Sequence, residues 1–499
     1  MAKRIMIQGS MSGAGKSLLV TALCRIFAQD GLRAAPFKSQ NMALNSYVTP
    51  DGLELGRAQA VQAEAAGLEC DVRMNPILLK PSSDTGSQLI VMGEVRGQYD
   101  AKDYFAMKKS LIPEIRAAYD SLAAENDVIV IEGAGSPAEI NLRADDIVNM
   151  GLAELVDAPV LITGDIDRGG VFAQLYGTVA LLRPEERRRV EGFVINKFRG
   201  DVELLKPGLV QLEELTAKPV LGVVPWLRLD IDDEDSLAPR LTKKAEKRDL
   251  DLAVIRLPHL SNFTDFSPLE EHPAIALRYV MKKAELGAPD LILLPGTKNT
   301  MGDLSWLFDY GLAGEIQRLC GAGTPVLGVC GGYQMLGRTL SDPEGVEQQG
   351  TREGLCLLPT ETVFTAEKTR TRRRADCVSG PFKGAKLEGY EIHMGQTRRL
   401  GGEAFCRLEN GGEDGTVSGH VFGTYLHGLF DSGELTVKLA DYLAARKGMP
   451  LPPVQISNRT AYRNRQYDLL ADAVRASLDM ERIYRIMEEY EHEGPARRD

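Results

Sequence analysis

Short apolar runs alternate along the chain with longer segments of mixed polarity. Apolar runs without strict polar alternation are typical of strands that are buried on both faces of a parallel sheet. In the first half of the chain they predict strands at residues 4–8, 127–132, 159–164, 192–196 and 220–226. Segments with helical composition and periodicity lie between them, as at 57–66 and 108–124. This order predicts a doubly wound α/β domain over residues 1–229.

The pattern lapses over residues 230–249, where charged residues and Pro239 replace apolar periodicity, and we interpret this segment as a linker. Beyond it, apolar runs at 250–257, 290–294, 324–329 and 419–427 predict a second doubly wound sheet within residues 250–440. Residues 441–499 are predicted to form a C-terminal helical tail. The sequence thus predicts two α/β domains, a linker and a tail.

A glycine-rich segment, GSMSGAGKS at residues 9–17, follows the first predicted strand and precedes a helix. The strict phosphate-loop pattern has glycine where this chain has Ser10, so the loop is a variant. Backbone N–H groups around Gly13 and Gly15 would cradle phosphates, Lys16 would reach the β- and γ-phosphate oxygens, and Ser17 would hold Mg²⁺. A glycine-rich turn without a ligand is the alternative, which Lys16 and Ser17 at the helix start disfavour. We predict an ATP site here.

Polar side chains end several predicted strands of the same domain, at the sheet edge where open α/β folds bind ligands. Glu132 follows a continuous apolar run and is our second Mg²⁺ candidate, although an acid that caps a turn would look similar. Residues 165–170, DIDRGG, suggest either a phosphate or substrate contact or a solvated loop. Asn196 could contact the nucleobase edge.

A second strand-to-helix turn carries the segment GVCGGYQMLG at residues 328–337. Two glycines after Cys330 allow a sharp turn that exposes the thiol, and the helix start behind it favours a thiolate. The N–H of Gly331 would stabilise an oxyanion, and the loop at Gly296 could supply the second donor. A buried structural cysteine is the alternative. The pattern predicts a cysteine nucleophile.

A general base is expected on a later strand. His427 ends the predicted strand at 419–427, and the order of a nucleophile elbow followed by a strand-end histidine is the one that a Cys/His hydrolase needs. His393, on another late strand, is the rival candidate.

Composition narrows the classes of partner. The chain has 499 residues and a formal net charge of −11, which argues against nucleic acid or an anionic membrane as the main partner. It contains no apolar run of the roughly 18 residues needed to span a bilayer. Seven cysteines without paired spacing, and no signal-peptide pattern at the start, predict a cytoplasmic protein with reduced thiols. No pattern predicts an oligomeric state.

Taken together, these motifs resemble the cobyrinate/cobyric acid amidotransferase family of cobalamin synthesis. The first half is similar to dethiobiotin-synthetase-like P-loop ATPases, and the second to class I glutamine amidotransferase domains. The matching segments are 9–17, 37–42, 132–136, 167–172, 258–266, 328–337 and 423–430. Most class I enzymes have Pro-Glu after the catalytic histidine, whereas Gly428 and Leu429 follow His427 here, so the resemblance implies a Cys/His dyad. Asp431 and Glu391 are guesses for a group that orients the imidazole.

The resemblance implies ATP and Mg²⁺ as cofactors, and glutamine, ATP and a corrinoid as substrates. Cys330 would release ammonia, and the first domain would amidate the four peripheral carboxylates b, d, e and g of adenosylcobyrinic acid a,c-diamide. A family member that amidates carboxylates a and c of cobyrinic acid is one alternative, which the matches at 40–42 and 167–170 disfavour. From another class, a P-loop ATPase switch with an inert regulatory domain remains open, although the Cys/His pair argues against inertness.

Overall fold

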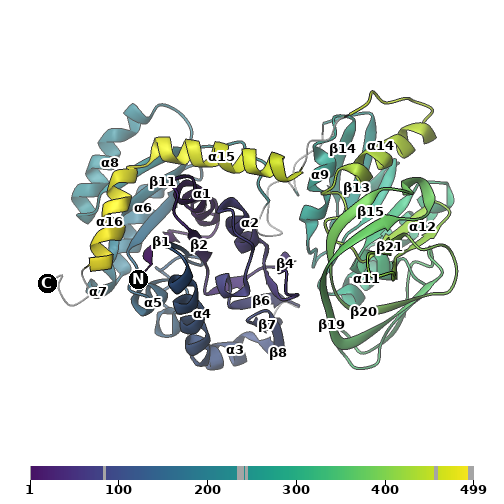
Figure 1. The fold of residues 1–499 in the computed structure, drawn as a ribbon, viewed down its shortest axis with the longest axis horizontal. Coiled ribbons are helices and arrows are strands. Elements are labelled where there is room, and N and C mark those ends of the chain that lie inside the picture. The colour runs from purple at the N-terminus through teal and green to yellow at the C-terminus, as the bar shows by residue number, and fades with distance from the viewer. Residues whose placement is uncertain (1, 83–85, 233–240, 242–245, 455–458, 493–499) are drawn as a thin grey trace.

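The computed structural model describes residues 2–82, 86–232, 241, 246–454 and 459–492. Most of the predicted linker, at 233–240 and 242–245, lies outside the described residues. Figure 1 shows two α/β domains side by side, with the N-terminal domain in purple and blue and the C-terminal domain in green. The predicted pair of α/β domains is therefore confirmed.

The N-terminal domain is built on a six-stranded sheet whose neighbouring strands are all parallel. In spatial order the strands are β12 (Val220–Pro225), β11 (Val190–Phe198), β10 (Val160–Asp165), β1 (Lys3–Gly9), β9 (Val128–Glu132) and β2 (Ala34–Phe37). The central strands β1, β9 and β10 are buried along almost their whole length, as their apolar runs predict.

Helices cover both faces of this sheet (Figure 1). One face packs against α1 (Lys16–Gln29) and the C-terminal helices α15 (Arg459–Ser477) and α16 (Met480–His492). The other face packs against α4 (Ile112–Glu125), α5 (Met150–Leu155), α6 (Val171–Leu181) and α8 (Val202–Thr216). The remaining helices of the domain are α2 (Arg57–Ala65), α3 (Ala101–Met107) and α7 (Pro184–Arg188).

Two small sheets lie on the side of the N-terminal domain that faces the other domain (Figure 1). The larger contains β3 (Gln40–Met42), β6 (Ile77–Pro81), β7 (Gly86–Val91) and β8 (Glu94–Asp100), and the smaller pairs β4 (Ser46–Val48) with β5 (Glu54–Gly56). Their strands are short, and β4 and β5 have no apolar run that would announce them. The segment between β2 and β4 crosses from the main sheet to the domain boundary.

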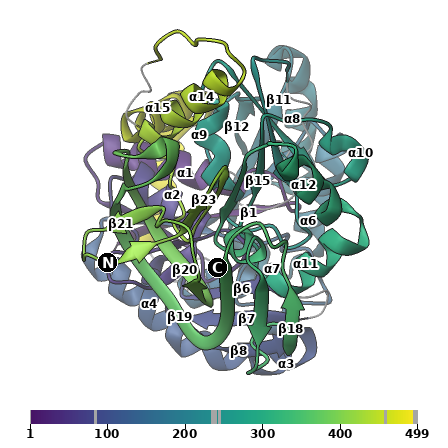
Figure 2. The ribbon, with the colours of Figure 1, turned by 90° about the vertical axis from the view of Figure 1, so that its right-hand side faces the viewer.

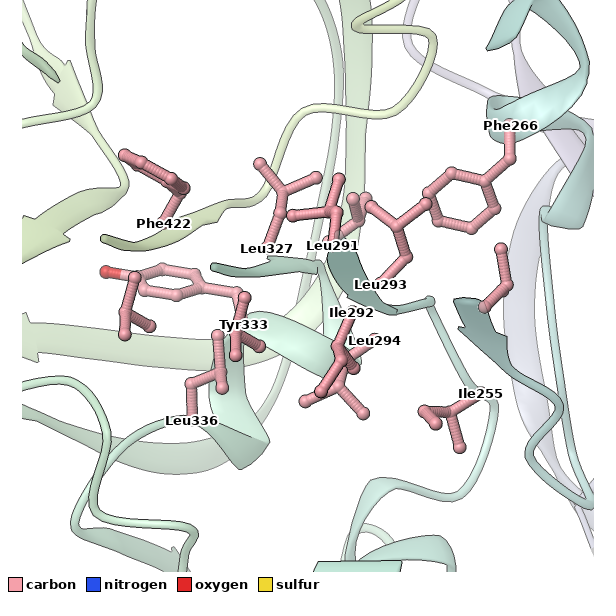
Figure 3. Packing of buried hydrophobic residues seen from close by; sticks show 14 of the residues in the cluster. Ile255, Phe266, Leu291, Ile292, Leu293, Leu294, Leu327, Tyr333, Leu336 and Phe422 are labelled. Atoms are coloured by element: carbon pink, nitrogen blue, oxygen red, sulfur yellow. The ribbon is translucent and has the colours of Figure 1, made fainter. Parts of the chain in front are cut away.

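The C-terminal domain has its own six-stranded sheet, parallel except for its edge strand β23. Its order is β14 (Ile275–Val280), β13 (Leu250–Ile255), β15 (Leu291–Leu294), β16 (Val326–Val329), β24 (Val421–Thr424) and β23 (Thr416–Ser418). Figure 3 shows Leu293, Leu327 and Phe422 of these strands in one buried cluster with Tyr333. The surrounding helices are α9 (Ser267–Glu270), α10 (Lys283–Leu286), α11 (Thr300–Asp309), α12 (Leu312–Gly321), α13 (Gly331–Met335) and α14 (Glu434–Arg446).

A further sheet in this domain contains a long antiparallel hairpin, prominent in Figure 2. Its strands are β17 (Thr339–Asp342), β18 (Gly350–Glu353), β19 (Thr360–Cys377), β20 (Lys386–Arg399), β21 (Cys406–Leu408) and β22 (Glu413–Asp414). The hairpin of β19 and β20 reaches the N-terminal domain, where Arg372 Nε donates to the carbonyl of Val48 at 3.0 Å. Lys368 of β19 also pairs with the fully buried Glu54 of β5.

The C-terminal tail returns to the first domain. The predicted boundary at residue 440 falls inside α14, so the second domain continues to Arg446. Leu470 and Val474 of α15 are buried with the residues of α1, and Leu478 forms a bridge to Gly222 of β12. Arg463 of α15 also donates to Asp431 of the second domain at 2.9 Å, so this helix contacts both domains.

Among the described residues, no helix is long and apolar enough to cross a membrane.

Candidate active sites

The cysteine elbow has the backbone that its sequence predicts. Cys330 lies between β16 and α13 with φ 52° and ψ −110°, a conformation that is unusual for any residue with a Cβ. Its N–H donates to the carbonyl of Thr424 at 2.8 Å, which ties the strained turn to β24. Gly332 must lack a side chain, because a Cβ there would collide with the carbonyl of Leu294. The turn therefore presents the thiol at the C-terminal edge of the sheet.

His427 lies directly beyond β24 and is oriented by an acid that sequence reasoning did not assign. Asp265 Oδ2 lies 2.6 Å from His427 Nδ1, and its Oδ1 accepts from the N–H of Gly428 at 2.9 Å. Asp265 is on the short helix η5 (Phe263–Phe266). The structure thus shows Asp265 in the place of the orienting group that the dyad left open, and its role as the third member of a triad is a proposal.

The two acids that we guessed for this role have other partners. Asp431 accepts from Arg463 at 2.9 Å and Glu391 from Arg373 at 3.1 Å. Asp265 lies within the segment 258–266 that contributed to the resemblance. Its contact with His427 spans 162 residues, so local spacing gave no indication of it.

Electrostatics in the triad favour a charged imidazole. Burial alone would lower the pKa of His427, but Asp265 and, less strongly, Cys330 raise it to about 10. His427 and Asp265 are almost fully buried, so water screens their attraction little. The arrangement holds an imidazolium beside the cysteine, from which a proton can be donated to a leaving group.

The predicted oxyanion glycines lie on either side of this pair. Gly331 is the first residue of α13, so its N–H has no partner within the helix. A Cβ on Gly331 would lie 3.1 Å from the backbone nitrogen of Thr297, and a Cβ on Gly296 would lie 3.1 Å from His427 Cε1. The structure thus brings the loop at Gly296 against the elbow, and the donor role of both glycines stays a prediction.

The rival base, His393 of β20, also lies near the site. Its Nδ1 is 2.8 Å from the carbonyl of Gly395, and its ring stacks on Tyr425 with 3.7 Å between centroids. Burial, and to a smaller extent the nearby His427, lower the pKa of His393 to about 4. Cys330 instead acts on the pKa of His427, which places His427 rather than His393 beside the thiol.

The second predicted site lies at the same edge of the other sheet. The loop between β1 and α1 contains Gly13 and Gly15, both with positive φ, and a Cβ on Gly15 would collide with the amide of Asn196. Lys16 Nζ donates to the carbonyls of Met11 at 3.3 Å and Gly135 at 3.2 Å. The loop is therefore curled, with its lysine folded back over it, as a phosphate cradle requires.

Glu132 lies beside the start of α1. Ser17 Oγ donates to it at 2.8 Å, Lys38 Nζ at 2.8 Å and Gln62 Nε2 at 2.5 Å. A hydroxyl and a carboxylate in contact at the head of a phosphate loop are the oxygen ligands that Mg²⁺ prefers, so these residues fit the ion. Their assignment as its ligands remains a proposal.

Asn196 and the segment 165–170 support the loop from the neighbouring strands. Asn196 Nδ2 donates to the carbonyl of Ala14 at 2.9 Å, and its Oδ1 accepts from the N–H of Lys197 at 2.8 Å. Lys197 Nζ bridges Gly13 at 2.6 Å and Asp165 at 2.8 Å. Asp167 pairs with Arg199 at 2.8 Å. The contact of Asn196 with a nucleobase stays a prediction.

Comparison with known proteins covers both domains. Residues 5–236 match the CobQ/CobB/MinD/ParA nucleotide binding domain family, and residues 251–435 match the CobB/CobQ-like glutamine amidotransferase domain family. The chain is 56% identical to a cobyric acid synthase of Ruminiclostridium cellulolyticum, over 98% of each protein. It is 54% identical to that of Lachnoclostridium phytofermentans, over 98% of this chain and 100% of the relative. It is 52% identical to that of Klebsiella pneumoniae strain 342, over 98% of each.

Proposed function

The chain belongs to the cobyric acid synthase family, and on that premise we propose that it is a glutamine-hydrolysing carbon–nitrogen ligase that makes cobyric acid. Its substrates are glutamine, ATP and adenosylcobyrinic acid a,c-diamide, whose four peripheral carboxylates b, d, e and g become amides. One observation carries the proposal: the same chain holds a buried Cys330, His427 and Asp265 triad and a curled phosphate loop with Lys16 and Ser17.

The C-terminal domain supplies ammonia. The thiolate of Cys330 attacks the side-chain amide carbon of glutamine, and the oxyanion forms beside the N–H of Gly331 and the loop at Gly296. The imidazolium of His427 donates its proton to the leaving nitrogen, so ammonia departs and a thioester remains. Asp265 holds the imidazole through Nδ1 during this transfer. Water then hydrolyses the thioester, which releases glutamate and restores the thiol.

The N-terminal domain activates the acceptor. Hydroxide is a poor leaving group and phosphate a good one, so a corrinoid carboxylate takes the γ-phosphoryl group of ATP before ammonia attacks it. Lys16 neutralises charge on the transferring group. Ser17 and Glu132 would hold Mg²⁺, which supplies further positive charge at the phosphate oxygens when it is bound.

A cytoplasmic location is part of this proposal. All seven cysteines are free thiols, and a reducing compartment maintains that state.

Mass spectrometry of the corrinoid products tests the proposal. The purified chain is incubated with glutamine, ATP, Mg²⁺ and adenosylcobyrinic acid a,c-diamide, and the carboxylate-to-amide exchanges are counted. Four successive exchanges are expected. A chain that leaves this substrate unchanged and adds two amides to cobyrinic acid would contradict the assignment. ATP hydrolysis without formation of any amide would instead favour a P-loop ATPase switch with an inert regulatory domain.

A further inference from the structure

One segment of the ATPase domain runs from the phosphate site to the glutaminase triad. At its first end, Lys38 Nζ contacts Glu132 at 2.8 Å. At its other end, Asn45 and the strand β4 lie against the C-terminal domain. Asn45 is 1% exposed and Ser46 is fully buried, so this end is enclosed by the two domains.

Asn45 and Ser46 form a reciprocal pair of hydrogen bonds with Asn262. Asn45 Oδ1 accepts from the N–H of Asn262 at 2.7 Å, and Asn262 Oδ1 accepts from the N–H of Ser46 at 3.0 Å. Asn262 is in the left-handed conformation with φ 50°, which asparagine adopts more readily than other residues with a side chain. Two buried bonds from the other domain hold this residue in place.

Asn262 in turn positions the acid of the triad. It caps η5, and its carbonyl accepts from the N–H of Asp265 at 3.0 Å. Asp265 contacts His427 Nδ1 at 2.6 Å. A hydrogen-bonded series therefore runs from Asn45, through Asn262 and Asp265, to the catalytic imidazole.

The same strand also supports His427 from a second direction. The ring of Tyr390 stacks on His427 with 5.3 Å between centroids and 23° between planes. Tyr390 Oη donates to the carbonyl of Ser46 at 3.2 Å, and Tyr47 meets the Tyr390 ring edge-on at 5.0 Å. The groups that face His427 are thus Asp265, Cys330, Tyr390 and the nearby His393.

We propose that Asn45 of the ATPase domain is a positioning residue of the glutaminase reaction, because its contact with Asn262 fixes the loop that holds Asp265 against His427. The inference rests on the proposed function. Its consequence is that the glutaminase triad is complete only when the two domains are docked.

The test substitutes Asn45→Ala in the full chain, which leaves the N–H of Asn262 without its buried acceptor. We expect glutaminase kcat to fall about 10–100-fold, since small displacements of catalytic groups have effects of this size. The alkaline limb of the kcat profile should move to lower pH, because a displaced Asp265 supports the imidazolium less. Amidation with added ammonia should stay within about threefold.

Two variants separate positioning from general damage. Asn75→Ala removes another buried asparagine of the same domain, whose amide bonds to Lys38 and Ile77, and it should leave the glutaminase pH profile unchanged. Asn262→Gly keeps the left-handed backbone and the N–H that donates to Asn45 Oδ1. It should therefore lose less glutaminase activity than Asn45→Ala.

An unchanged kcat and pH profile in Asn45→Ala would overturn the inference while leaving the proposed function intact. Equal losses with glutamine and with ammonia would also overturn it, because they would indicate damage to the whole fold. If the wild-type chain hydrolyses no glutamine, the proposed function fails and the inference fails with it.

Discussion

Cys330 and Lys16 both lie where a parallel strand turns into a helix, yet their surroundings differ. Beside the thiol, His427 is already hydrogen-bonded to Asp265 and raised in pKa by both Asp265 and Cys330. Lys16 instead donates to two backbone carbonyls, and Glu132 is engaged by Ser17, Lys38 and Gln62. Phosphate and metal ion must exchange these bonds as they bind. The difference indicates a preorganised glutaminase site and an ATP site that rearranges around its ligands.

The largest expected effect comes from removing the nucleophile. Cys330→Ala should lower amidation with glutamine by about 10⁴-fold or more, because no other group can form the thioester. Amidation with added ammonia should persist, since the ATP site is untouched. Product formation with each nitrogen source, assayed side by side, checks this. Equal loss with both nitrogen sources would contradict the claim that the C-terminal domain releases ammonia and the N-terminal domain performs the amidation.

Removing Lys16 from the phosphate loop should abolish amidation while leaving glutamine hydrolysis intact. Lys16→Ala should lower amidation about 10³-fold with either nitrogen source, because the transferring phosphoryl group loses its cation. Glutamine hydrolysis should continue, and it is measured as glutamate release. Lys206→Ala, at an exposed lysine of the same domain, is the matched control and should change neither rate. Ammonia-supported synthesis that survives in Lys16→Ala would rule out this loop as the ATP site.

Removing the charge of the orienting acid should affect only the glutaminase. Asp265→Asn should lower glutamine hydrolysis about 10²-fold or more. Asp265 helps to raise the pKa of His427 to about 10, and the imidazolium is lost as the pH rises through that value. Without this charge the pKa falls, so the alkaline limb of the kcat profile should move to lower pH. Asp431→Asn is the control. A larger shift of the alkaline limb in that variant would indicate that Asp431, and not Asp265, orients His427.

The smallest effect is expected at the rival base. His393→Gln should change glutamine hydrolysis by less than about threefold, because the ring of His393 is engaged by Gly395 and Tyr425, whereas His427 is the histidine that Asp265 orients. Steady-state glutamate release measures this. A loss comparable to that of His427→Gln would show that His393 takes part in proton transfer.

Local pattern was enough to predict the parts of the fold and site that depend on neighbouring residues. Buried parallel strands are continuous apolar runs, and both strand-to-helix turns need glycines at fixed offsets, so Cys330, Lys16 and Glu132 could be placed. The strands β19 and β20 are polar and contain long part-buried or exposed stretches without regular alternation, so the sequence predicted only a short strand around His393.

Contacts between distant segments could not be predicted from one sequence. Asp265 meets His427 across 162 residues, and Asn262 meets Asn45 across 217. Asparagine and aspartate in a loop are also common turn residues, so composition did not single them out. The helix α15 is mostly polar, so its sequence did not indicate which of its few buried residues pack against the first domain.

The central claim is that ammonia made at Cys330 serves the chemistry of the other domain within the same chain. It is tested most directly by supplying glutamine labelled with ¹⁵N in its amide, together with unlabelled ammonium salt, ATP, Mg²⁺ and adenosylcobyrinic acid a,c-diamide. Mass spectrometry then reads the isotope in each new amide. The account predicts ¹⁵N in the new amides despite the unlabelled pool. New amides that carry the isotope of the ammonium salt instead would contradict it.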